Sequence, residues 1–62
     1  MSSLMTPAEL ANMLRVTERT LDNWRDSGTG PPYIRLGNQR HHRVLYNLSS
    51  VLAWLDQNPG GP

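Results

Sequence analysis

The stretch MTPAELANMLRVTERTLDNWRDSG, residues 5–28, decides the fold. It contains two helix starts of the same kind, each opened by a threonine that can cap the helix. Thr6 is followed by Pro7, which suits the first helical position, and by Glu9, which completes a capping box. The first helix is therefore predicted to begin at Pro7.

A second helix start follows after a short connection. Thr17 is the predicted cap of a helix over residues 17–27, and Gly28 suits the left-handed position that ends it. The first helix is predicted to end near Leu14 or Arg15, so about three residues join the two helices. A connection this short favours a helix-turn-helix in which the helices cross at a steep angle.

Each of these helices has one apolar face at helical spacing. The predicted inward residues are Leu10, Ala11 and Leu14 in the first helix and Leu21 and Trp24 in the second. The charged and amide side chains of the second helix lie largely on the opposite side: Glu18, Arg19, Asp22, Asn23 and Asp26. They form either an ordinary solvated face or a surface that touches a partner.

A small hairpin is predicted after the second helix. The runs 33–36 and 43–46 favour strands, and they flank a turn signal at Gly37-Asn38 with a polar, basic loop over about residues 37–42. An isolated hairpin is marginally stable in water, so one of its faces must pack on the helices. The residues predicted for that face are Ile34, Leu36, Val44 and Tyr46.

The last element is predicted to be a third helix. Ser49 is its expected cap, and Asn58-Pro59 is its expected end. Its inward residues are Val51, Trp54 and Leu55. The predicted fold is mainly α with a small β-hairpin, a winged helix-turn-helix composed of a helix-turn-helix, a two-stranded wing and a C-terminal helix.

Length and composition limit the class of protein. The 62 residues predict a single domain over 1–62, with a core at about 4–58 and a flexible tail at 59–62. The absence of cysteine excludes disulfides and thiolate-bound zinc. No apolar run is long enough to span a membrane and no leader pattern is present, so we expect a cytoplasmic protein without a membrane partner.

The basic charge of the chain is concentrated in its second half. The formal net charge is +1, residues 1–31 sum to −1 and residues 32–62 sum to +2. All six basic residues are arginines, whose side chains can fork onto phosphates or a guanine edge. Residues 35–43 contain three of them and no acid. This local charge indicates a nucleic-acid partner.

The order of these motifs resembles the small excisionase and MerR-like DNA-binding domains. The resemblance rests on LMTPAELANMLRVTERTLDNWRDSG, GPPYIRLG and RVLYNLSSVLAWL, and it covers about residues 4–56. Arg15 departs from the pattern, because the turn usually has glycine there. Glu18 and Asp22 make the second helix less basic than is usual in this family.

The resemblance implies binding to double-stranded DNA through two elements. The second helix would enter the major groove with the residues Thr17, Glu18, Arg19, Thr20, Asp22 and Asn23. The hairpin would reach the minor groove or its flanking phosphates with Asn38, Gln39, Arg40, His41, His42 and Arg43. Further phosphate candidates are Arg15, Arg25 and Arg35.

Side-chain chemistry suggests how the second helix would read bases. Arg19 can fork onto guanine, Asn23 can pair with adenine, and Glu18 can accept a hydrogen bond from the cytosine amino group. Thr17 and Thr20 can donate to phosphate at the positive end of the helix.

Several functions remain open at this point. The resemblance favours an excisionase, also called a recombination directionality factor, of a phage or mobile element. Such a protein binds near an attachment site, bends the DNA and directs integrase toward excision. A small transcriptional regulator is the alternative within DNA binding, and a protein-interaction module on the same scaffold is the alternative from another class.

Other partners follow from the size and composition of the chain. Further copies of the chain bound side by side on DNA, and an integrase, are possible partners. We expect no enzyme activity, no cofactor and no metal, because no catalytic constellation is recognisable and adjacent histidines in a strand point to opposite faces.

Overall fold

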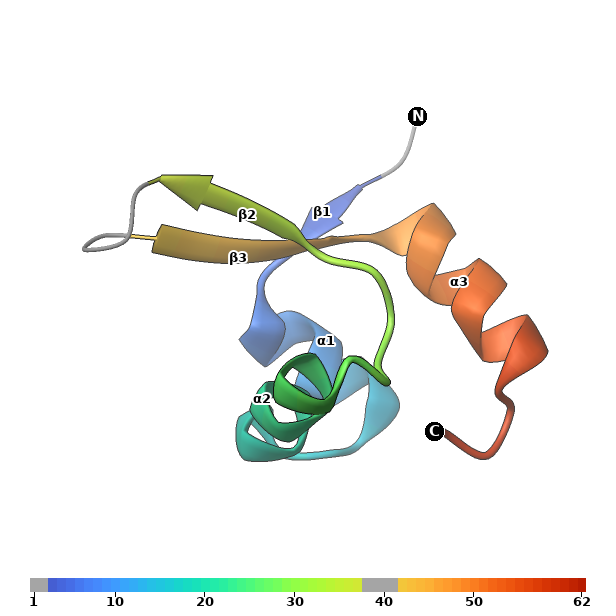
Figure 1. Ribbon diagram of the computed structural model, residues 1–62. Coiled ribbons are helices and arrows are strands. Elements are labelled where there is room, and N and C mark those ends of the chain that lie inside the picture. Colours follow the sequence, from blue (N-terminus) through green and yellow to red (C-terminus); the bar gives the residue numbers. More distant parts are fainter. Residues whose placement is uncertain (1–2, 38–41) are drawn as a thin grey trace.

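The computed structural model describes residues 3–37 and 42–62. In chain order its elements are β1 (Leu4–Met5), α1 (Pro7–Leu14), α2 (Glu18–Ser27), β2 (Ile34–Gly37), β3 (His42–Asn47) and α3 (Leu48–Gln57). Strand β3 lies between β1 and β2, α1 and α2 lie below this sheet, and α3 continues from the end of β3 (Figure 1). The predicted winged helix-turn-helix fold is confirmed.

Helix α1 begins as its sequence predicts. The Thr6 hydroxyl oxygen accepts a hydrogen bond from the Glu9 amide at 3.2 Å, and the Glu9 carboxylate accepts one from the Thr6 amide at 2.9 Å. This reciprocal pair satisfies two amides that have no partner within the helix. Leu10 and Ala11 are buried and Leu14 is half-buried, so the predicted inward face of α1 is confirmed.

The turn between α1 and α2 is made by a residue with a left-handed backbone. Arg15 has φ 59° and ψ 42°, and its amide donates to the carbonyl of Asn12 at 3.3 Å. The amide of Val16 donates to the carbonyl of Ala11 at 2.9 Å. These bonds close α1 and redirect the chain within three residues. Glycine adopts this conformation freely, whereas a side chain in it is strained.

Helix α2 also has its predicted ends. The Thr17 hydroxyl accepts from the Thr20 amide at 3.1 Å, and Gly28 stands at the C-cap with φ 70°. The amide of Thr29 closes the end by donating to the carbonyl of Trp24 at 2.9 Å. Leu21 is fully buried and Trp24 is half-buried, which confirms the predicted inward side of α2.

One small core joins all three helices to the central strand. Its buried members come from α1, α2, β3 and α3: Leu10, Ala11, Leu21, Tyr46 and Val51. Partly buried apolar residues surround them, namely Met5, Leu14, Val16, Trp24, Val44 and Leu55. Each of these four elements therefore contributes one or two buried side chains, and the opposite side of each helix remains available to solvent.

The strand register corrects one sequence prediction. Residue pairs in the β2–β3 ladder are Ile34 with Leu45, Arg35 with Val44 and Leu36 with Arg43. Paired residues of antiparallel strands share a face, so Ile34 and Leu36 lie on the face opposite to Val44 and Tyr46. Ile34 is 39% exposed and Leu36 is 47% exposed. The expectation that both pack on the helices was wrong, because a one-residue change of register moves every side chain to the other face.

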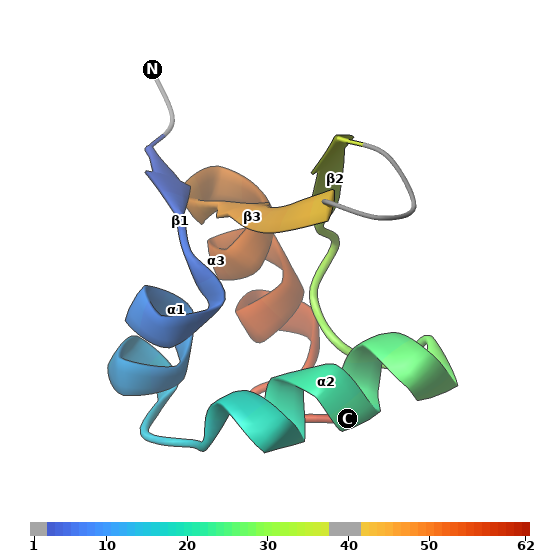
Figure 2. The same cartoon turned by 90° about the vertical axis from the view of Figure 1, so that its left-hand side faces the viewer.

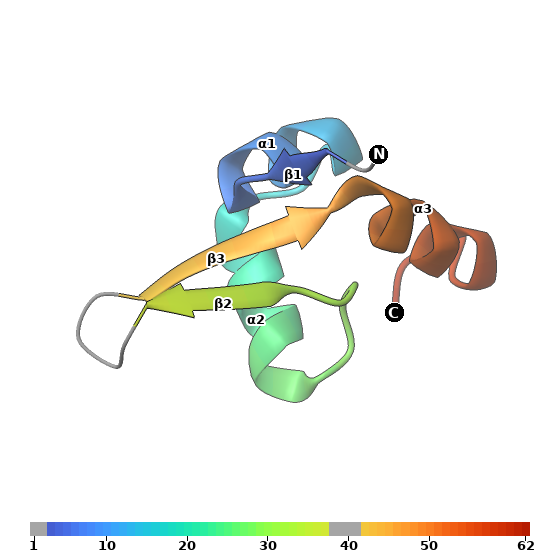
Figure 3. The ribbon, with the colours of Figure 1, turned by 90° about the horizontal axis from the view of Figure 1, so that it is seen from above.

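The wing also has a third strand that the sequence did not indicate. Leu4 pairs with Asn47 and Met5 pairs with Tyr46, so β1 extends the hairpin on the far side of β3 (Figure 3). Two residues are too few to produce a readable alternation. The half-buried Met5 packs against the core from this strand.

The cap of α3 differs from the prediction as well. The side-chain oxygen of Asn47 accepts from the Ser50 amide at 3.3 Å, and the helix begins at Leu48, before Ser49. Asn47 and Ser49 are both good cap residues, and the sheet decides between them because β3 ends directly at Asn47. Val51 is buried, and Trp54 and Leu55 are half-buried, as predicted.

The end of the chain turns back toward α2 (Figure 1). The amide of Asn58 donates to the carbonyl of Trp54 at 2.9 Å and ends α3 where predicted. The amide of Gly61 donates to the carbonyl of Asn58 at 2.9 Å, and Gly61 is half-buried near Trp24. The flexibility proposed for residues 59–62 stays a prediction. Within residues 3–37 and 42–62, every helix is too short or too polar to cross a membrane.

The strained turn gives a test of the helix-turn-helix geometry. Replacing Arg15 by glycine should raise the free energy of unfolding by about 0.5–1 kcal/mol, because relief of the left-handed strain exceeds the extra entropy of glycine in the unfolded chain. Urea unfolding measures this change. Arg15→Ala is the matched control, because it removes the same charge but keeps the strain. Equal stability of the two variants would contradict the observed turn.

Candidate nucleic-acid interface

The outward side of α2 is polar, and no other element in residues 3–37 and 42–62 covers it. Its five charged and amide residues are exposed, as the sequence predicts: Glu18, Arg19, Asp22, Asn23 and Asp26. Leu21 on the opposite side is fully buried and fixes the rotation of the helix about its own axis. Figure 2 shows α2 lying across the front of the molecule, with α3 behind it.

These side chains form two rows along the helix. Arg19 and Asn23 are four residues apart and share one row, while Glu18 and Asp22 share the neighbouring row. The first row can donate hydrogen bonds through its guanidinium and amide groups, and the second can accept them through its carboxylates. A surface with adjacent donors and acceptors can discriminate between base edges in a major groove.

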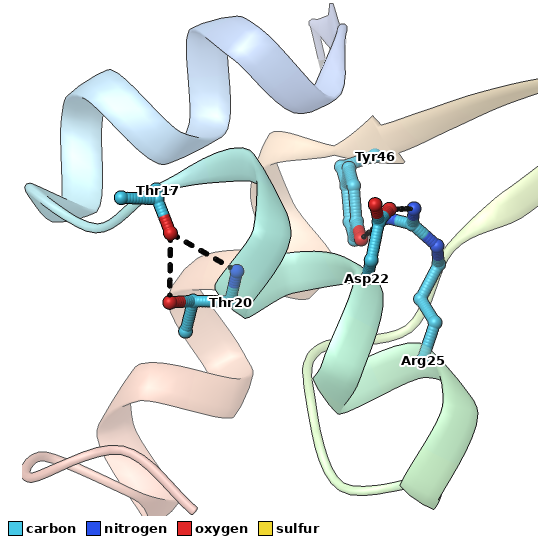
Figure 4. Close-up of polar contacts among 5 residues, drawn as sticks. All are labelled: Thr17, Thr20, Asp22, Arg25 and Tyr46. Carbon is cyan, nitrogen blue, oxygen red and sulfur yellow. Dashed lines mark hydrogen bonds and ion pairs between the residues drawn. The ribbon is translucent and has the colours of Figure 1, made fainter.

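Two hydroxyl groups meet at the start of α2 (Figure 4). The hydroxyls of Thr17 and Thr20 are 3.0 Å apart, and the Thr17 oxygen also accepts the Thr20 amide. One hydroxyl proton serves the bond between the two side chains, so the other can be donated to an external acceptor. Thr17 is exposed and Thr20 is half-buried. Thr17 therefore caps the helix and also leaves the pair a donor suited to a phosphate oxygen.

Arg25 is engaged within the protein rather than extended into solvent. Its guanidinium donates to the Tyr46 hydroxyl at 2.7 Å and forms an ion pair with Asp22, as Figure 4 shows. The guanidinium carbon also lies 6.0 Å from the ring centre of Tyr33. The Arg25 side chain is 17% exposed. Of the three arginines proposed as additional phosphate contacts, this one is therefore held by neighbouring side chains.

The strands of the wing extend to the same side of the molecule as α2. The ends of β2 and β3 at Gly37 and His42 project on this side, toward the viewer in Figure 2. Arg35 and Arg43 are exposed, but the register places them on opposite faces of the hairpin. An arginine is thus available on each face of the wing, and a nucleic acid that lies across α2 can meet this end of the hairpin.

The other predicted wing contacts are residues 38–42. Asn38, Gln39, Arg40 and His41 lie outside the described residues. His42 pairs with Gly37 through its place in β3, but its side chain is outside the description. Their proposed roles stay predictions.

The turn adds one more exposed arginine. Arg15 lies at the junction that leads into α2, and its side chain is exposed. Within the described ranges, no group of three or more histidine, aspartate or glutamate side chains is arranged to hold a metal ion. The chemistry available at this surface is hydrogen bonding and charge pairing.

Comparison with known families agrees with this geometry. Residues 4–59 match the family model described as a helix-turn-helix domain, which is most of the chain. The chain belongs to this helix-turn-helix family. The helix-turn-helix family includes excisionase-like DNA-binding proteins and supports double-stranded DNA as the partner. No curated protein and no solved structure matches the chain significantly.

Family membership assigns the elements of the site. In a helix-turn-helix domain the second helix lies in the major groove and its early exposed residues contact base edges. Helix α2 is the second helix here, and its first two turns carry Glu18, Arg19, Asp22 and Asn23. The individual base contacts of these residues stay predictions.

Sequence reasoning missed the side chains that connect this surface to the core. Tyr46 was expected on the hairpin face that packs on the helices, but its hydrogen bond to Arg25 was not foreseen. The two residues are separated by 21 positions, and no local pattern indicates such a contact. Tyr33 lies beside both, with its ring centre 6.3 Å from that of Tyr46.

Proposed function

We propose that this chain is an excisionase, a recombination directionality factor that binds DNA beside an attachment site, bends it and directs integrase toward excision. The observation that carries the proposal is the exposed donor and acceptor face of α2 on the same side as the wing, in a helix-turn-helix domain. The protein acts without enzymatic chemistry of its own, on DNA in the cytoplasm.

The size of the interface supports binding as several copies. One small module covers on the order of 600–1,000 Å² of protein surface on DNA, which limits the affinity of a single copy. Adjacent copies on neighbouring sites would raise the total affinity by making binding cooperative. Binding of this kind would also allow a series of small bends to accumulate beside an attachment site.

Three classes of side chain have distinct roles in this proposal. Arg19 and Asn23 contact bases, because they project from the first turns of the recognition helix. Arg43 and Arg35 approach the DNA phosphates or the minor groove from the two faces of the wing. Arg15 contacts phosphate from the turn that precedes α2, where its charge is exposed.

A gel-shift titration on DNA that flanks the gene of this chain tests the proposal. At two salt concentrations we expect a ladder of bands that favours this DNA over a scrambled duplex and weakens as salt rises. Adding the integrase of the same element and its attachment sites should then increase excision. Binding without any effect on excision would support a transcriptional regulator instead. No shift at either salt would leave a protein-interaction module as the better function.

Two arginine variants separate base reading from phosphate contact. Arg19→Ala should weaken binding to the preferred site by about 1–3 kcal/mol and relax the choice at one base pair. Arg43→Ala should weaken preferred and scrambled DNA alike and reduce the slope of log K against log salt by about 1. Fluorescence anisotropy with labelled duplexes measures both effects.

The two variants serve as controls for each other, because each removes one positive charge. Asp56→Asn removes a negative charge instead of a positive one. Asp56 is exposed on α3, the helix behind α2 in Figure 2, so we expect this variant to change binding little. An Arg19→Ala variant with unchanged base preference would remove this residue from the reading surface. A loss of affinity for the preferred site alone in Arg43→Ala would show that the wing reads sequence.

A further inference from the structure

The side of α2 that faces the sheet carries a contact that the proposed function does not use. Arg25 projects from α2 toward the sheet, where its guanidinium donates to the Tyr46 hydroxyl of β3 at 2.7 Å. The same group pairs with Asp22 and stands over the ring of Tyr33, just before β2. One side chain therefore links α2 to β3 and lies close to the residue that precedes β2.

These contacts leave little of Arg25 for a phosphate. Its side chain is 17% exposed, and Tyr46 is 1% exposed. A charged donor to a hydroxyl in a part-buried setting is stronger than a neutral hydrogen bond, and breaking it leaves a buried hydroxyl without its donor. By contrast, Arg15, Arg19, Arg35 and Arg43 are all exposed.

We propose that Arg25 is a positioning residue, which fixes the angle between the recognition helix and the wing through Tyr46 and Asp22. This inference rests on the proposed DNA binding. It adds the contact that sets the angle between α2 and the hairpin. The pairing with Arg25 also offsets part of the negative charge of Asp22, which would otherwise oppose the DNA phosphates.

The geometry of the hairpin explains why this angle matters. Tyr46 stands four residues from His42, so the end of β3 lies about 13 Å along the strand from the contact. If β3 rotated by about 10° around Tyr46, its His42 end would move by about 2 Å, because that end lies about 13 Å away. Hydrogen-bond distances vary by only a few tenths of an ångström. A hairpin displaced by about 2 Å would therefore lose its contacts with DNA while α2 stays in the major groove.

Tyr46→Phe tests the proposal without touching the DNA surface. The variant removes the hydroxyl but keeps the ring in the core, and the buried hydroxyl is not available to DNA. We expect affinity for the preferred site to fall by about tenfold and the salt slope to fall by about 1, because the displaced hairpin loses its phosphate contact. Tyr33→Phe is the matched control, since Arg25 approaches its ring, and it should bind as the unmodified chain does.

Arg25→Lys separates positioning from charge. Lysine keeps the positive charge but lacks the planar fork that reaches Tyr46 and Asp22 together. We expect Arg25→Lys to bind about as weakly as Tyr46→Phe. The double variant should be no weaker than either single variant, because both changes break the same contact between Arg25 and Tyr46. Normal binding by Tyr46→Phe and Arg25→Lys, with a reduced salt slope in Arg25→Ala, would show a phosphate contact and overturn the proposal.

A measurement on the free protein keeps this test separate from DNA binding. Residual dipolar couplings of backbone amides report the angle between α2 and β3, and we expect it to change or to become variable in Tyr46→Phe and Arg25→Lys. Urea unfolding confirms that the variants are folded under these conditions. An unchanged angle in both variants would overturn the positioning role, whether or not the chain binds DNA. Failure of the unmodified chain to bind DNA would instead contradict the proposed function.

Discussion

The burial of one side chain from each major element against the others is the constraint on which this structure depends. Leu10, Leu21, Tyr46 and Val51 come from α1, α2, β3 and α3, and all are at most 1% exposed. A chain of 62 residues can bury few side chains completely, so these contacts fix both the crossing of the helices and the position of the sheet. Loss of one would affect every element at once.

The same constraint produces the surface that we propose for DNA binding. Because Leu21 must point into the core, the residues on the other side of α2 must point outward. Because Tyr46 is held in the core, β3 leaves it in a fixed direction and carries the hairpin to the side where α2 is exposed (Figure 2). Packing therefore sets the arrangement of the two elements, and the exposed side chains supply the chemistry.

The parts of the fold that depend on neighbouring residues were predictable. The caps at Thr6 and Thr17 and the glycine end at Gly28 are decided within one helical turn, and all three are observed. The sequence marked Arg15 as unusual, because glycine is usual at this turn in the family it resembles. The structure gives the reason, since Arg15 has the left-handed backbone that glycine adopts freely. The exposed face of α2 followed from helical periodicity alone.

The parts of the fold that depend on distant residues were not predictable from the sequence. The choice of which hairpin face packs inward depends on register, and Ile34 and Leu36 show how a shift of one residue reverses it. The cap of α3 is decided by where β3 ends, which favours Asn47 over Ser49. The bond from Arg25 to Tyr46 requires the finished fold, and so no sequence pattern could indicate it.

The central claim is that DNA is bound by the face formed by α2 and the wing. An NMR titration of the uniformly labelled chain with a short duplex tests this claim most directly. We expect the largest amide shifts at residues 18–23 and around the end of the hairpin, with little change at Leu52 and Ala53 on the exposed side of α3. Shifts concentrated on α3 or on the outer sheet face around Leu4 and Ile34 would contradict the claim.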